Sequence, residues 1–233
     1  MKLSVDMFDE LTPESIEIAR ALKARVDQRA DETQSSIREV VELALNGYFA
    51  HLDRETEVRS TAYHEAGHVV VAAVKGLKLR KRGLRIDQEG SGIAYYESKQ
   101  KDGSSDIGED PSRVASIVAA YAGHHAQARF YPGCGTASAC CDTEQAHDLE
   151  NEMFSEPRVQ CEKDAEYKKQ SKELVNQRWK AIEALAEALL AKPLTPQVGC
   201  ERRWSHQCQE KVITGEEIIS LLARHGVSAT LVD

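Results

Sequence analysis

Three residues near the middle of the first half have the types and spacing of a hydrolytic metal site: His64, Glu65 and His68. Residues four apart on a helix lie on one face, roughly 5 to 6 Å apart at Cβ, so two imidazoles can bind one tetrahedral zinc ion. Glu65 directly follows the first imidazole, so its carboxylate lies beside the metal and can accept a proton from bound water. The spacing predicts Zn²⁺ held by His64 and His68, with Glu65 as the general base.

The alternative is that these side chains lie by chance on a solvated helix face. Apolar residues continue the segment through Val69–Val71, which favours a buried helix. Gly67 in mid-helix costs up to about 1 kcal/mol relative to alanine. We therefore expect another backbone, or a substrate, to approach the helix closely at Gly67.

A catalytic zinc ion needs a third protein ligand and an open position for water, so another part of the chain must supply a residue. Asp142 follows a loop rich in small residues and lies where a helix is expected to begin. Its simpler role there is an N-cap. Spacing alone leaves the third ligand open among Asp142 and five other residues: His124, His125, Glu144, His147 and Glu150.

Helical periodicity dominates the pattern that must position these residues. Amphipathic helices are expected after Thr12, after Ser36, and from about Glu55 to Val74. Residues 78–98 alternate around two glycines, which predicts a β hairpin.

The second half is expected to be helical too. Helices should begin at Asp110-Pro111 and near Asp142, and a long charged helix should cover residues 162–191. Thr214 and Glu217 have the spacing of a capping box for a last short helix.

Residues 1–55 are expected to form an N-terminal helical region, and residues 56–233 the domain that carries the chemistry. A short extended piece followed by two helices is also the order of ribbon-helix-helix DNA-binding proteins. Residues 1–60 hold eight Lys/Arg against thirteen Asp/Glu, a net charge of −5, which is the wrong sign for phosphate contacts. We expect helical packing or self-association into a homo-oligomer instead, and no nucleic-acid partner.

The bulk composition limits the other classes. A formal charge of −8 over 233 residues argues against a binder of nucleic acid or anionic membranes. The apolar stretches are too short to span a bilayer, and the N-terminus lacks the apolar core of a secretory signal, so a cytoplasmic location is expected. Six cysteines are then expected as free thiols, with Cys200 and Cys208 the first pair to suspect of a disulfide.

Residues 61–72 (TAYHEAGHVVVA) resemble the active-site helix of the FtsH-type ATP-dependent zinc proteases. The hairpin around residues 92–95 lies where that family has its substrate-side strand. Residues 121–127 (YAGHHAQ) resemble its Gly-Gly-x-x-Ala-Glu helix, and residues 138–146 (SACCDTEQA) resemble its Gly-Ala-Ser-Asn-Asp segment. The resemblance, which spans about residues 58–225, implies that Asp142 is the third zinc ligand.

Several departures from the family bear on activity. The chain has no Gly-Lys dipeptide and hence no P-loop, so the resemblance covers the peptidase part without the ATPase or the membrane anchors. Gln127 stands where the family has a glutamate beside the zinc ligands, Ser138 replaces a glycine and Cys141 an asparagine. The loss of a carboxylate at position 127 is expected to weaken the orientation of the metal ligands.

The sequence thus predicts a mainly α fold: a zincin-like helical metallopeptidase domain with a small β hairpin or sheet, preceded by the helical region. The expected function is ATP-independent, zinc-dependent hydrolysis of peptide bonds in unfolded or flexible polypeptides, which would lie along an exposed strand edge. The alternative is a zinc-binding, peptidase-like interaction or regulatory module. The sequence leaves open a separate ATPase partner.

Overall fold

The computed structural model divides into two compact units, Met1–Asp53 and Arg54–Asp233. The residues it describes are 21–30, 37–98, 108–132, 140–196 and 209–233. In the first unit, residues 21–30 are helical. The extended piece and the helix start expected before residue 21 lie outside the described residues, as do Cys200 and Cys208.

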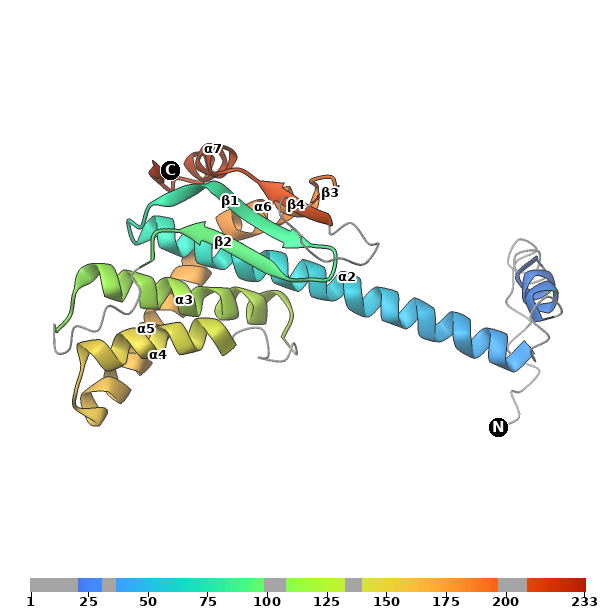
Figure 1. Ribbon diagram of the computed structural model, residues 1–233, viewed down its shortest axis with the longest axis horizontal. Helices are drawn as coiled ribbons and strands as arrows, with labels where there is room; N and C mark the ends of the chain where they lie inside the picture. Colours follow the sequence, from blue (N-terminus) through green and yellow to red (C-terminus); the bar gives the residue numbers. More distant parts are fainter. Residues whose placement is uncertain (1–20, 31–36, 99–107, 133–139, 197–208) are drawn as a thin grey trace. The chain divides into compact units, whose positions relative to one another are not determined.

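The prediction of a mainly helical fold with a small β sheet is confirmed (Figure 1). In chain order the elements are α2 (Ile37–Val74), β1 (Leu79–Asp87), β2 (Gly92–Tyr96), α3 (Pro111–Phe130), α4 (Cys140–Met153), α5 (Pro157–Gln177), α6 (Trp179–Leu190), β3 (Thr195–Pro196), β4 (Gln209–Ile213), α7 (Gly215–Arg224) and β5 (Leu231–Val232).

The prediction of separate helices after Ser36 and from Glu55 is wrong, because α2 is one helix of 38 residues. The segment between them contains no proline, and Gly47 is accommodated within the helix. The helix ends at Val74, and Gly76 follows with a positive φ of 80°, a conformation that favours glycine.

The sheet has the order β2-β1-β4-β3. β5 lies off this path and pairs with Leu79 and Arg80 at the start of β1. β1 is antiparallel to both β2 and β4 and parallel to β5. The hairpin of β1 and β2 was predicted, whereas β3, β4 and β5 were not. β2 lies at the end of this order, so one of its edges pairs with no described strand.

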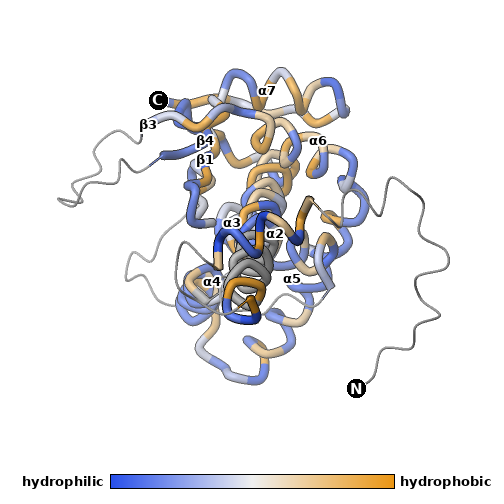
Figure 2. The backbone as a smooth tube through the Cα atoms, turned by 90° about the vertical axis from the view of Figure 1, so that its right-hand side faces the viewer, coloured by the Kyte–Doolittle hydropathy of each residue, from blue (hydrophilic) through white to orange (hydrophobic). Residues whose placement is uncertain are grey.

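Within the Arg54–Asp233 unit, the end of α2 runs between two layers. Figure 2 views α2 nearly along its axis, with the sheet and α7 on one side and α4 and α5 on the other. Residues 62–73 are buried all round, as expected for a helix that has neighbours on every face. The motif predicted to carry the chemistry therefore lies in the interior.

The long helix predicted over residues 162–191 is instead two helices, α5 and α6, which meet at Arg178 (φ −105°, ψ 15°). The two helices pack on different neighbours: α5 against α3, and α6 against α7 and the sheet. One straight helix cannot bury an apolar face in both layers. Periodicity within a segment does not reveal this change of partner.

Two predicted caps are confirmed. The side chain of Asp110 accepts a hydrogen bond from the backbone N–H of Ser112 at the start of α3. Thr214 and Glu217 form the capping box of α7. Among the residues that the structure describes, no helix combines the length and apolar character that a bilayer crossing requires.

Candidate metal centre

The end of α2 is positioned by a close crossing with α3. A Cβ atom on Gly67 would lie 2.7 Å from the carbonyl oxygen of Ala122 and 2.7 Å from Cβ of Ala126. Only glycine fits this contact, so the close approach of a backbone expected at Gly67 is present. One turn earlier on the same face of α2, the ring of Tyr63 stacks on Phe130 of α3, with 4.1 Å between centroids. Both contacts fix the rotation of α2 about its axis.

With α2 fixed in this way, three ligand-type atoms converge on one point. Nε2 of His64 and Nε2 of His68 are 3.0 Å apart. Oδ2 of Asp142 lies 2.9 Å from the first and 3.3 Å from the second. Ligands held at about 2.0 to 2.2 Å by a tetrahedral ion lie roughly 3.3 to 3.6 Å from one another, so the observed spacing is close to that of a zinc site. We call His64, His68 and Asp142 the metal group; it could hold a metal ion.

The Nδ1 atom of each imidazole has a hydrogen-bond partner away from the metal group. This leaves the two Nε2 atoms as the ones that can bind a metal ion. Nδ1 of His68 lies 2.7 Å from the carbonyl oxygen of Ala119, which can only accept, so Nδ1 carries the hydrogen. Nδ1 of His64 lies 3.1 Å from Oε1 of Gln127, whose Nε2 donates to Ser60 at 3.0 Å. In the neutral rings both Nε2 lone pairs therefore face each other, an arrangement that either a proton or a metal cation between them relieves.

The charges of the metal group also favour a cation. Burial alone would lower the pKa of His68, but the hydrogen bond and charge of Asp142 raise this pKa to about 9. Burial works against ionisation of Asp142, yet both imidazoles hold its pKa well below the usual range. The carboxylate thus stays ionised at neutral pH and supplies the negative charge that a divalent ion requires.

Asp142 lies inside the first turn of α4, which begins at Cys140. The structure therefore does not place Asp142 at the N-cap position, and its carboxylate points to the imidazoles of α2. The other candidates lie elsewhere: Glu144 is exposed, and Nδ1 of His125 contacts the hydroxyl of Ser171 at 3.1 Å. His124 is half-buried and is not part of the metal group.

The side chain of Glu65 lies beside the metal group. Glu65 is 8% exposed, and it lines a pocket of about 260 Å³ together with His68, Asp142 and residues of β2. Burial raises the pKa of Glu65, while the two imidazoles and a hydrogen bond with the Ala94 backbone act in the opposite direction. A carboxylate that is desolvated beside side chains able to hold a metal cation has the environment of a general base.

Two glycines for which the sequence predicted no role in the site, one in the hairpin and one in the segment 121–127, make room for these side chains. A Cβ atom on Gly123 of α3 would lie 2.3 Å from Nε2 of His68 and 2.7 Å from Nε2 of His64. A Cβ atom on Gly92 of β2 would lie 2.5 Å from Cγ of Glu65. The glycines themselves were visible in the sequence, but their partners depend on how α2, α3 and β2 pack.

A second group contains two of the rival candidates, His147 and Glu150 of α4, together with Asp164 of α5. Glu150 is fully buried, and burial together with Asp164 raises its pKa to about 7, against smaller opposing effects of Tyr121 and Lys168. The ammonium of Lys168 lies 2.8 Å from Asp164. The second group therefore already contains its own cation.

Comparison with known protein families finds no family model that matches the chain, and comparison with curated proteins finds no match either. The assignment of the site therefore depends on its residues and their geometry.

Proposed function

We propose that the protein is a zinc-dependent metalloendopeptidase that hydrolyses peptide bonds in unfolded or flexible polypeptides. The observation that carries the proposal is the convergence of two Nδ1-protonated imidazoles and one carboxylate beside a buried glutamate. Two nitrogens and one carboxylate oxygen suit zinc and leave one position of a tetrahedron open, which is the ligand set of catalytic zinc sites. The resemblance of residues 61–72 to the FtsH-type proteases agrees with this proposal.

The division of work follows from the positions of the side chains. Bound zinc would lower the pKa of a water molecule to about 7 and polarise the scissile carbonyl. Glu65 accepts the proton of the attacking water and carries it to the leaving amine. Ala119 and Gln127 keep the imidazoles of His68 and His64 in the tautomer that presents Nε2.

The geometry of β2 favours an extended substrate. Gly92, Ile93, Ala94 and Tyr96 of this strand line the pocket that contains Glu65. Because one edge of β2 pairs with no described strand, an extended polypeptide can pair with it and bring a carbonyl to the pocket. Folded proteins do not offer such a strand, and the chain has no P-loop to unfold them, so we expect cleavage to be independent of ATP.

One observation favours a second candidate, a zinc-binding module with little hydrolytic activity. The partner of His64 is the neutral amide of Gln127, where the resembling family has a carboxylate. A neutral acceptor strengthens the ligand less than a charged one does. This candidate predicts zinc binding without turnover.

Glu65→Gln distinguishes the two candidates. The unmodified chain and this variant are compared for zinc content and for cleavage of unfolded casein, with and without chelator. We expect equal zinc content and a loss of cleavage to background, because the carboxamide cannot accept a proton while the metal group is intact. His68→Ala is the matched control, and it should lose both zinc and cleavage. Cleavage that persists in Glu65→Gln would contradict the mechanism, and zinc binding without cleavage by the unmodified chain would favour the second candidate.

A further inference from the structure

β1 contains a bulge that turns three consecutive cations outward. Leu79 pairs with Tyr96 and Leu84 with Ala94, so five steps along β1 match two steps along β2. In a regular strand successive side chains alternate between faces, but Arg80, Lys81 and Arg82 are all exposed. Bulges are frequent beside active sites, where they redirect side chains.

Gly83 closes the bulge. Its φ is +69°, and a Cβ atom there would lie 2.1 Å from the carbonyl oxygen of Ile213. No other residue fits this position without moving β4. The outward direction of the three cations is therefore imposed by the fold.

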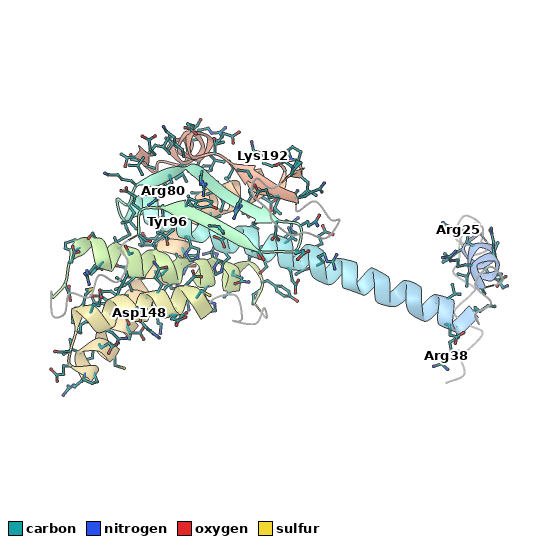
Figure 3. The ribbon with its side chains drawn as sticks, in the orientation of Figure 1. Arg25, Arg38, Arg80, Tyr96, Asp148 and Lys192 are labelled. Carbon is teal, nitrogen blue, oxygen red and sulfur yellow. The ribbon has the colours of Figure 1, made fainter. Side chains whose placement is uncertain are left out.

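The cations border a hollow that continues the pocket containing Glu65. This hollow of about 700 Å³ is lined by Arg80, Lys81 and Arg82 of the bulge, by Tyr95 of β2 and by Asp233, whose carboxylate pairs with Lys81. It shares three of its lining residues, Ala94, Tyr96 and Ser98, with the pocket that contains Glu65. Figure 3 labels Arg80 and Tyr96, which lie close together on the sheet. We call this the basic hollow; a polypeptide at Glu65 that continues past Tyr96 enters it.

Two of its cations are free to bind a ligand. Within the part of the chain that the structure describes, neither Arg80 nor Arg82 forms an ion pair. The guanidinium of Arg82 lies 5.7 Å from the centroid of the Tyr95 ring, which holds it over the hollow. Lys81 already pairs with a carboxylate, that of Asp233. This concentration of positive charge lies in a chain whose net charge is −8.

We propose that the basic hollow binds acidic side chains of the substrate polypeptide and thereby selects acidic segments for cleavage beside them. The inference rests on the proposed peptidase function. Guanidinium groups match carboxylates in charge and geometry, and the shared wall of the two pockets requires the acidic residues to lie on one side of the scissile bond. A nucleic acid is the less favoured occupant. The hollow offers only three cations, and the negative net charge of the chain would repel a long run of phosphates.

The test measures binding and cleavage separately. Binding is measured by fluorescence anisotropy on zinc-loaded Glu65→Gln, which cannot consume the peptide. The probes are flexible labelled peptides that share one central sequence and carry a block of Glu, Gln or Lys on one side, each with an amidated C-terminus. We expect the Glu peptide to bind about tenfold more tightly than the Gln peptide at low salt, and the difference to vanish near about 0.5 M NaCl.

Arg80→Glu combined with Arg82→Glu should abolish or invert this preference, and the conservative change of both to lysine should retain it. The matched control is Lys169→Glu with Lys180→Glu, which alters the net charge equally on exposed helical positions. Thermal melting establishes that each variant is folded. Equal binding of the Glu and Gln peptides, or equal loss of preference in the control, would overturn the proposal. So would a single-stranded oligonucleotide that displaces the Glu peptide at comparable concentration.

Cleavage by the unmodified chain separates this proposal from the one on which it rests. Hydrolysis of all peptides at equal rates would overturn the basic hollow as a selector and leave the peptidase function standing. A charge preference in binding, with no hydrolysis of any peptide, would overturn the peptidase function and leave the hollow as a binding site for acidic polypeptide.

Discussion

The metal group and the second group contain the same kinds of residues, yet their surroundings differ. In the metal group, acceptors behind both imidazoles fix the tautomer, and the three inner atoms lie within 3.3 Å of one another. In the second group, Nε2 of His147 is 3.8 Å from Asp164, and the side chain of His147 is 46% exposed. The metal group is therefore the more compact and the more buried of the two.

The two groups also differ in the partners of their aspartates. Asp142 has imidazoles as its partners, whereas Asp164 has the ammonium of Lys168 and the hydroxyl of Tyr121, which donates at 2.7 Å. A metal ion at Asp164 would have to displace an existing cation. Residue types and mutual distances are therefore insufficient to identify a metal site, and the partners behind the ligands decide it.

The largest expected effect tests this contrast with one carboxylate from each group. Asp142→Ala should reduce zinc affinity by orders of magnitude, because two imidazoles alone rarely hold the ion. Asp164→Ala should leave zinc affinity unchanged. Competition titration with a chromogenic chelator measures both. Loss of zinc from Asp164→Ala with retention in Asp142→Ala would reverse the comparison.

Gly123→Ala probes the space behind the imidazoles without removing a ligand. The added methyl group would lie against Nε2 of both His64 and His68, so the rings must turn away. We expect zinc affinity to fall by about 10- to 100-fold, the range seen when ligand orientation is lost. In Gly76→Ala the methyl group meets open space at a positive φ, which should cost about 1 to 2 kcal/mol of stability and leave zinc binding intact. Equal zinc affinities in the two variants would show that α3 does not constrain the site.

The second group should instead respond to protons. Its Glu150 has a pKa of about 7, above the ordinary value of 4.5, so the folded state holds this proton more tightly than the unfolded state does. This contribution to stability is complete below about pH 4.5 and is lost as the pH rises through 7, up to about 3 kcal/mol in all. Urea unfolding between pH 4.5 and 7.5 should show a decline that Glu150→Gln removes and that Glu144→Gln, at an exposed position, retains. A zinc ion held by this group would favour the ionised carboxylate and reverse the slope.

The parts of the site that local pattern determines were predictable. The spacing of His64 and His68 follows from helix geometry, the caps of α3 and α7 follow from residue type, and the hairpin follows from alternation. Asp142 was preferred only through a family resemblance, since spacing could not choose among the candidates. Its carboxylate reaches the imidazoles because α4 packs on α3.

The parts that depend on contacts between distant segments were missed. β4 and β5 are short and become strands by pairing with β1, and the break at Arg178 follows from a change of packing partner. The bulge at Arg80–Arg82 is invisible in sequence for the same reason, because a register shift is defined only against the neighbouring strand.

Gln127→Glu is expected to have the smallest effect and to test the contrast most finely. An ionised carboxylate would accept the Nδ1 hydrogen of His64 more strongly than the amide does, so zinc affinity should rise by up to about tenfold. The change also removes the amide that donates to Ser60, and Gln127 is 6% exposed, so the zinc-free protein should lose about 1 to 3 kcal/mol of stability. Melting with and without zinc separates the two terms, and Ser60→Ala, which removes only the second hydrogen bond, serves as the control. A variant that binds zinc more weakly than the unmodified chain would mean that the neutral amide suits this site better than a charge, and orientation rather than ligand basicity would then distinguish the metal group from the second group.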